Sequence, residues 1–205
     1  MLSVGSWIKG EAGKYKVLKE LSVGGMGHVY YGESGQGDKV VVKTPVRKGN
    51  GYDDQRLEKL KVESRILKGM NHANIVRYVD EGISKNIFFL VVGFVDGRNM
   101  RDLFWLKPAL DTEAETFVLK LLEAVDYIHG MNIIHRDINP KNIIVESTLT
   151  LVLIDFGAAK QGFTQLFGSG TQIGTPGWSA PEQFTTGIVS ASSDIYSVGA
   201  TAFFL

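Results

Sequence analysis

The sequence predicts an α+β fold in two parts, a sheet-rich first half with one helix and a second half led by helices. Short alternating or β-branched segments, separated by glycine and polar turns, dominate the chain before residue 95. A long segment with apolar residues at helical spacing follows residue 110. The change falls near Val95-Asp96-Gly97, so we expect one part over residues 1–95 and the other over residues 96–205.

The composition is that of an ordinary globular protein. The chain has 205 residues, 22 Lys+Arg against 22 Asp+Glu, and 44% hydrophobic residues. The neutral balance gives no general reason to expect nucleic acid or an anionic membrane as a partner. The absence of cysteine excludes disulfides, Cys-ligated metals and thiol catalysis, and it is compatible with a reducing compartment. With no apolar stretch of signal-peptide or membrane-helix length in sight, we expect a cytoplasmic protein without a membrane segment.

Charge is distributed unevenly along the chain. Residues 1–92 hold 15 Lys+Arg and 10 Asp+Glu, whereas residues 93–205 hold 7 and 12. Random scatter explains this difference, and so does a first half that faces an anionic ligand while the second supplies carboxylates for a metal. The imbalance does not choose between the two.

The first half should contain about five strands and one helix. Apolar and long side chains alternate from Tyr15 to Val23, which predicts one face of a strand. We expect the remaining strands over 29–31, 39–43, 75–79 and 87–92, and a loop over 47–54. The helix is indicated by residues at helical spacing, which are Leu57, Leu60, Ser64 and Leu67.

The second half begins with a predicted helix. Thr112 and Glu115 have the spacing of a capping box, and Gly130 stands where a C-cap belongs. The apolar stripe between them consists of Val118, Leu121, Leu122 and Val125. The sequence ends in an apolar run without a cap or polar tail, so we expect a chain cut within a helix.

Two features of the first half have both a plain and a functional interpretation. Glycines between Ser22 and Val29 join two predicted strands, which is usual for a hairpin and also suits close approach to phosphate. A dinucleotide-binding turn is disfavoured because a strand, not a helix, follows. Lys43 closes a strand, and Glu63 lies on the apolar face of the predicted helix, where a carboxylate needs a cation. Lys43 is a candidate partner for Glu63.

The strongest chemical signal lies between two short apolar runs. Asp137 and Asn142 stand five residues apart in a tight loop, and Asp155 follows a predicted buried strand. Carboxylate and amide oxygens suit Mg²⁺ that is held partly by substrate phosphate. A remaining carboxylate can orient a hydroxyl and accept its proton.

Six motifs follow one another along the chain, namely SVGGMGHV, VVVK ending at Lys43, Glu63, HRDINPKN, Asp155-Phe156-Gly157 and Ala180-Pro181-Glu182. In this order they resemble the signature of the eukaryotic-type (Hanks-type) serine/threonine protein kinases. The GGMG turn and the sequence PEQ resemble bacterial or archaeal members. The resemblance covers the chain from about Tyr15 to its end. It implies the bilobal protein-kinase fold, with an antiparallel sheet and one helix in the N-lobe and a mainly helical C-lobe that is incomplete here.

The resemblance also implies ATP and Mg²⁺ as cofactors and assigns roles to individual residues. Asp137 would orient the attacking hydroxyl, Lys43 would contact the α- and β-phosphates and pair with Glu63, and Asn142 and Asp155 would hold the metal. Thr175 would contact Asp137. The implied nucleotide-binding residues are Val23, Gly24, Gly25, Gly27, Val29, Val41, Lys43, Val92, Phe94, Val95 and Ile144.

The segment before Ala180 resembles that of serine/threonine rather than tyrosine kinases, which implies protein substrates with Ser or Thr acceptors. Arg136 precedes the expected catalytic aspartate, an arrangement used to bind a phosphate on the activation loop. Ordinary loop hydroxyls are the alternative for each possible acceptor of that phosphate. The candidates are Thr164, Ser169 and Thr171.

Two departures from the family pattern leave the activity open. Ser22 replaces the first loop glycine, and Asn139 stands where serine/threonine kinases usually carry a lysine that touches the transferring phosphate. Losing such a donor costs about 3 kcal/mol of transition-state stabilisation, and Lys141 is a possible compensation. A pseudokinase that binds nucleotide without transfer is therefore the alternative function, with a small-molecule kinase as a third.

Overall fold

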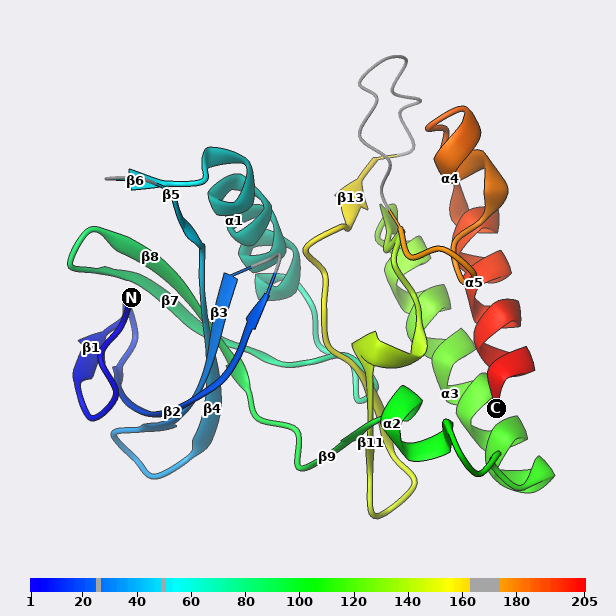
Figure 1. Ribbon diagram of the computed structural model, residues 1–205, viewed down its shortest axis with the longest axis horizontal. Helices are drawn as coiled ribbons and strands as arrows, with labels where there is room; N and C mark the ends of the chain where they lie inside the picture. Colours follow the sequence, from blue (N-terminus) through cyan, green and yellow to red (C-terminus); the bar gives the residue numbers. More distant parts are fainter. Residues whose placement is uncertain (25–26, 49–50, 163–173) are drawn as a thin grey trace. The chain divides into compact units, whose positions relative to one another are not determined.

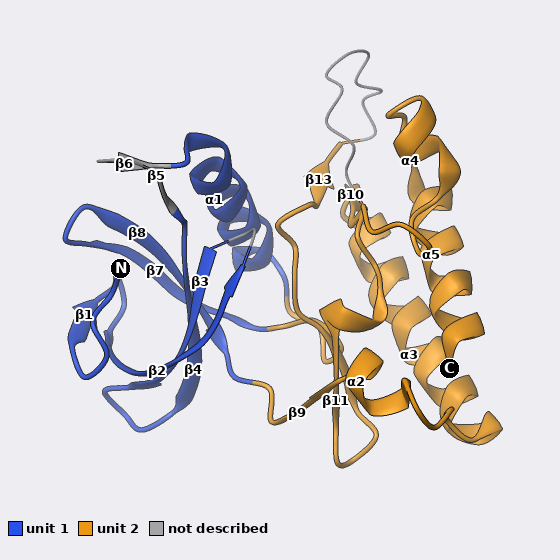
Figure 2. Ribbon diagram, in the orientation of Figure 1, with its two compact units in different colours: residues 1–70, 77–94 blue, residues 71–76, 95–205 orange. Residues whose placement is uncertain are grey.

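The structure is a computed structural model that describes residues 1–24, 27–48, 51–162 and 174–205 (Figure 1). The chain forms two compact units, shown in different colours in Figure 2. The first consists of Met1–Met70 and Arg77–Phe94, and the second of Asn71–Val76 and Val95–Leu205. The change of unit after Phe94 falls where the composition changes, but the sequence did not predict that Asn71–Val76 belongs to the second unit.

Six of the described strands form an antiparallel sheet in the first unit, in the order β1-β2-β3-β4-β8-β7. The predicted loop over 47–54 contains a short hairpin, β5 (Arg47–Lys48) with β6 (Gly51–Tyr52). The sheet strands are β1 (Trp7–Lys9), β2 (Lys14–Gly24), β3 (Gly27–Ser34), β4 (Lys39–Thr44), β7 (Tyr78–Ser84) and β8 (Ile87–Gly93).

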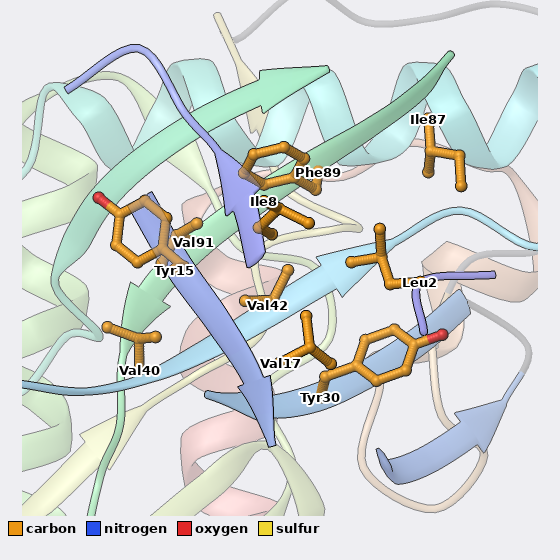
Figure 3. Packing of buried hydrophobic residues seen from close by; sticks show 10 residues of the cluster. All are labelled: Leu2, Ile8, Tyr15, Val17, Tyr30, Val40, Val42, Ile87, Phe89 and Val91. Carbon is orange, nitrogen blue, oxygen red and sulfur yellow. The ribbon is translucent and has the colours of Figure 1, made fainter. Parts of the chain in front are cut away.

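One face of this sheet carries the apolar core of the first unit (Figure 3). In the regular parts of β2, β3, β4 and β8, every second residue points to this face, because successive side chains alternate across a sheet. The core also includes Leu2 and Ile8 from the start of the chain. Its remaining members are Tyr15, Val17, Tyr30, Val40, Val42, Ile87, Phe89 and Val91.

The alternation predicted for β2 holds only in its first part. Tyr15 and Val17 are buried, but Leu21 and Val23 are exposed. The pairing of β2 with β3 shifts register after Val17 and again after Glu20. The first shift moves Lys19 to the opposite face, and the second returns Val23 to the face of Val17, at the end of the hairpin. A period of two read from the sequence cannot show such bulges.

Helix α1 (Asp54–Lys68) is the helix predicted in the first half. The Asp53 side chain caps it by accepting from the backbone N–H of Arg56 at 3.2 Å. The strand predicted over 75–79 is wrong in position, since β7 begins at Tyr78 and Ile75 forms an isolated bridge with Leu153 in the second unit. Val76 donates its N–H to Leu153 O at 2.9 Å, so tertiary pairing decides the conformation of this apolar run.

Helices dominate the second unit, as predicted, and the α+β class is confirmed. Among the described residues, no helix has the length and apolar character needed to cross a membrane. The helices are α2 (Met100–Phe104), α3 (Asp111–Gly130), α4 (Pro181–Thr185), α5 (Ala191–Phe204) and the 3-10 turn η1 (Pro140–Asn142). The short strands are β9 (Gly97–Asn99), β10 (Ile133–Ile134), β11 (Ile143–Glu146), β12 (Leu151–Leu153) and β13 (Lys160–Gln161).

The long helix α3 starts slightly earlier than its predicted capping box. Glu113 rather than Glu115 accepts from a preceding backbone N–H, that of Leu110, at 3.0 Å. Leu122, which the predicted stripe included, is partly exposed. The buried stripe consists of Phe117, Leu121, Ala124, Val125 and Ile128. This stripe anchors the strands and loops that follow α3.

Candidate functional site

A buried ion pair joins β4 to α1 in the first unit. Lys43 Nζ lies 2.6 Å from Glu63 Oε1, and the side chain of Glu63 is only 4% exposed. Glu63 belongs to the buried face of α1, so its carboxylate has a cation opposite it instead of water. The structure therefore contains the pair that the sequence suggested.

The glycine-rich segment forms the end of the β2–β3 hairpin, where Gly24 pairs with Gly27. Gly27 has φ +144°, and a Cβ atom there would lie 1.9 Å from Thr44 O. Only glycine fits this close approach between β3 and β4. Gly25 lies outside the described residues.

Strand register places several of the predicted nucleotide-binding residues on the face of Lys43. Val29 is the direct cross-strand partner of Lys43, and Val41 is the partner of Val92. Directly paired residues point to the same side of a sheet, and Val41 shares the face of Lys43 by alternation.

Val23 is not brought to this face. It pairs with His28, which precedes Val29 and therefore points to the opposite side. Its side chain is exposed. The two register shifts of β2 cancel for Val23, which therefore lies on the same face of the sheet as Val17.

The remaining predicted nucleotide-binding residues are divided between the units. Phe94 ends the first unit and donates its N–H to Lys39 O at 3.3 Å. Val95 begins the main part of the second unit. Ile144 lies on β11, where it pairs with Val152 of β12 and Asn99 of β9.

The loop that carries the predicted catalytic aspartate is fixed by Asp194 of α5. The fully buried Asp194 carboxylate accepts the backbone N–H groups of His135 and Arg136, both at 2.8 Å, and contacts His129 Nε2 at 2.9 Å. Arg136 has φ +68°, a conformation that is uncommon for a residue with a side chain. Two backbone hydrogen bonds to this carboxylate hold the loop in its strained path, and the contact with His129 of α3 holds the carboxylate.

Asp137 is surrounded by hydrogen-bond donors. Thr175 Oγ1 donates to Asp137 Oδ1 at 2.6 Å, and Asn142 Nδ2 donates to Oδ2 at 3.0 Å. Burial raises the pKa of the Asp137 carboxyl above its ordinary value, and the hydrogen bond from Thr175 opposes this rise. The group is therefore a carboxylate in fixed orientation with increased affinity for a proton, as a general base requires.

Asn139 belongs to the same network. Its side chain is buried, its Nδ2 donates to Asp137 Oδ1 at 3.1 Å and to Thr175 Oγ1 at 3.3 Å, and its Oδ1 accepts the N–H of Lys141 at 3.0 Å. From the sequence we interpreted Asn139 only as a missing lysine. The structure shows in addition that Asn139 connects Asp137 with Thr175.

Asn142 and Asp155 are the two residues predicted to hold a metal, and both carry side-chain oxygen atoms. The backbone N–H of Ile154 donates to Asn142 O at 3.0 Å, which brings the residue before Asp155 against Asn142. Asp155 Oδ1 accepts the N–H of Gly157 at 2.9 Å, and the side chain is partly exposed. An amide and a carboxylate oxygen fit Mg²⁺ that completes its coordination with phosphate and water.

Arg136 is partly engaged by the protein itself, since its Nε donates to Ala158 O at 2.6 Å. The three candidate phosphate acceptors, Thr164, Ser169 and Thr171, lie outside the described residues.

Comparison with known proteins agrees with this geometry. The family described as "Protein kinase domain" matches residues 15–205. The chain is 33% identical over 195 residues to the probable serine/threonine-protein kinase PknB of Lactococcus lactis, which covers 94% of this chain and 31% of that protein. It is 33% identical to the serine/threonine-protein kinase pkn2 of Myxococcus xanthus, over 91% of this chain and 23% of that protein.

A third relative is the serine/threonine-protein kinase PrkC of Bacillus subtilis, which is 28% identical over 94% of this chain and 30% of that protein. The chain thus spans less than a third of the length of these curated relatives. The predicted resemblance to serine/threonine kinases, including bacterial ones, is confirmed.

Proposed function

The chain belongs to the protein kinase domain family, and on that premise we propose that it transfers the γ-phosphoryl group of ATP to serine and threonine hydroxyls of proteins. The observation that carries the proposal is the network around Asp137. One carboxylate oxygen accepts from Thr175 and Asn139, and the other accepts from Asn142. A substrate hydroxyl that replaces or joins one of these donors would be aligned with a carboxylate that can accept its proton.

The first unit would bind the phosphates of the nucleotide with a cation and with close backbone contacts. Lys43 would contact the α- and β-phosphates while Glu63 keeps its ammonium group in place, as the 2.6 Å pair supports. Gly24, Gly25 and Gly27 would let the backbone approach the phosphates. Val29, Val41 and Val92, with Ile144, Phe94 and Val95, would surround the adenine. We leave Val23 out of this set because of its pairing with His28.

The family uses ATP with Mg²⁺, and we propose that Asn142 and Asp155 hold the metal in this chain. When bound, Mg²⁺ neutralises charge on the phosphates during transfer. Asn142 would then act twice, since its Nδ2 already donates to Asp137. Its amide oxygen would serve the metal while its amide nitrogen orients the base.

The proposed partners are ATP and proteins with Ser or Thr acceptors. The relatives are named as serine/threonine kinases, which supports hydroxyl acceptors of this type. We further propose that the reaction takes place in the cytoplasm, on the ground that ATP is its substrate.

Phosphoamino-acid analysis tests the transfer. The purified protein is incubated with Mg²⁺ and ATP labelled at the γ-phosphate, together with a mixture of unstructured proteins, beside an Asp155→Ala variant. We expect phosphoserine and phosphothreonine with the parent, and far less of both with the variant. Equal labelling by the two proteins, or label on tyrosine alone, would contradict the proposal.

A further inference from the structure

The first 14 residues lie outside the matched kinase domain, which begins at residue 15. They nevertheless fold onto the sheet of the first unit. β1 pairs with β2 in an antiparallel register, and Leu2 and Ile8 belong to the buried core (Figure 3). We call residues 1–13 the N-terminal segment.

The N-terminal segment is fastened to β7 through Asp80. The Asp80 carboxylate is 2% exposed and accepts the N–H groups of Ala12 and Gly13 and the hydroxyl of Tyr15, all within 3.2 Å. Gly10 lies so close that a Cβ atom there would stand 2.2 Å from Asp80 Oδ2. Burial raises the pKa of the Tyr15 hydroxyl, and its hydrogen bond to Asp80 adds to the rise.

The next residue, Glu81, points the other way, because adjacent residues of a strand face opposite sides of the sheet. Its carboxylate accepts the hydroxyl of Ser64 on α1 and lies 3.4 Å from Lys68 Nζ on the same helix. Its backbone oxygen accepts the N–H of Glu11 at 2.9 Å. Glu81 thus binds the N-terminal segment with its main chain and α1 with its side chain.

The contact on α1 adjoins the ion pair with Lys43. Ser64 is completely buried and directly follows Glu63. Without Glu81, the buried Ser64 hydroxyl would lose this hydrogen-bond partner, and a movement of α1 that gives the hydroxyl another partner would be favoured. A shift or rotation of α1 displaces Glu63, which holds Lys43 at 2.6 Å.

We propose that Glu81 is a positioning residue for phosphoryl transfer: it fixes α1 so that Glu63 holds Lys43, and the N-terminal segment fixes Glu81. This inference rests on the proposed function for its effect on rate. It assigns the N-terminal segment a role in the activity of the kinase domain. Removal or displacement of this segment would lower activity without changing the reacting groups.

The test uses Glu81→Ala, Ser64→Ala and the double variant in the full chain, with Glu33→Ala as the matched control. Glu33 is an exposed carboxylate on β3 of the same sheet. Assays run well below the melting temperature of each variant and give kcat and KM for ATP. Hydrogen exchange reports separately on the amides of α1.

We expect Glu81→Ala and Ser64→Ala each to lower kcat/KM for ATP by about 3-fold to 30-fold, the range measured for coupling between sites. The double variant should lose no more than the larger single loss, because both changes remove one contact. Amides of α1 should exchange faster in all three proteins. Glu81→Gln keeps an oxygen for Ser64 and should recover most of the rate, and Glu33→Ala should behave as the parent.

A lower melting temperature with unchanged kcat/KM and unchanged α1 exchange in Glu81→Ala would show a merely structural role and overturn the proposal. Losses that add in the double variant would do the same. Gly10→Ala tests the role of the N-terminal segment. If the α1 amides of that variant exchange as slowly as in the parent, the role proposed for residues 1–13 is overturned. A parent protein without transfer activity would refute the proposed function, while the exchange data still decide on Glu81.

Discussion

The side-chain amide of Asn139 connects Asp137 to Thr175, with its Nδ2 3.1 Å from Asp137 Oδ1 and 3.3 Å from Thr175 Oγ1. Asp137 and Asn139 belong to the loop from His135 to Asn142, and Thr175 belongs to the segment before α4, far away in sequence. Asn139 is also held in place, since its Oδ1 accepts the N–H of Lys141. The residue that departs from the usual lysine is therefore part of the scaffold of the proposed base.

Removal of this amide should impair the chemical step. We predict that Asn139→Ala lowers kcat by about tenfold or more, because loss of one buried hydrogen-bond partner costs about 1–3 kcal/mol. KM for ATP should change little, since Asn139 contacts Asp137, the proposed base, and is not among the residues proposed to bind the nucleotide. Steady-state kinetics at saturating acceptor measure both constants. A rise in KM with unchanged kcat would place Asn139 outside the chemistry.

Introduction of the usual lysine should have the opposite effect on rate. An Asn139→Lys side chain can still donate to Asp137 and adds a positive charge near the transferring phosphate. We predict an increase of kcat that exceeds any change of KM for ATP. The same charge should lower the pKa of Asp137 and move the acid limb of the rate profile to lower pH. An unchanged kcat would indicate that Lys141 or another group already supplies the contact.

The hydroxyl of Thr175 should matter more than its methyl group. Its 2.6 Å hydrogen bond to Asp137 is the shortest contact of that carboxylate in the described network. We predict that Thr175→Val lowers kcat by about tenfold, on the scale of one hydrogen bond to a charged group. Thr175→Ser keeps the donor and should retain most of the rate. Equal loss in the two variants would argue for a packing role instead.

Variants of the Lys43–Glu63 pair should show that the stability of the protein and its transfer activity can be changed separately. Lys43→Met leaves the buried Glu63 carboxylate without its principal cation, which should cost about 3–5 kcal/mol of unfolding free energy and abolish transfer. In the double variant Lys43→Met/Glu63→Gln the charge is gone, so the melting temperature should recover while activity stays lost. Thermal unfolding and the transfer assay together check this. Failure of the second change to restore stability would contradict the account of the pair.

The expected pH dependence follows from the partial burial of Asp137. Because burial raises its pKa, the carboxylate is protonated at a higher pH than an ordinary aspartate. The base is lost on protonation, so kcat should fall as the pH drops through this raised value. The free energy of unfolding should change with pH in the opposite direction to the rate. Because burial disfavours the charged form, Asp137 contributes stability at low pH, and this contribution is lost as the pH rises through its folded pKa. A rate profile without an acid limb would contradict Asp137 as the base.

Much of this site could be predicted from sequence because each motif is local. The sequence predicted Lys43 at a strand end, Glu63 on an apolar helix face and the loop from His135 to Asn142. Chemistry that depends on residue type and local spacing can be recognised from the sequence alone. The family match confirms the resemblance that these motifs indicated.

What the sequence could not show arises from pairing between distant segments. The first bulge of β2 moves Lys19 to the other face of the sheet, and the bridge to Leu153 takes Ile75 out of the predicted strand. Neither event has a local signal, because the partner strand decides register. The link from Glu81 to Ser64 likewise needs the fold, since a charged residue in an alternating strand suggests only a solvent-facing side.

The central claim, phosphoryl transfer that depends on Asp137, is tested most directly by the intact mass of the purified chain. The parent protein and an Asp137→Asn variant are each incubated alone with ATP and Mg²⁺. A further sample contains the variant together with the parent, which tests whether the variant can still accept phosphate. We predict that the parent gains phosphate when it is incubated by itself. The Asp137→Asn variant should gain phosphate only when the parent is present. Phosphate on Asp137→Asn by itself, or on neither protein under any of these conditions, would contradict the account.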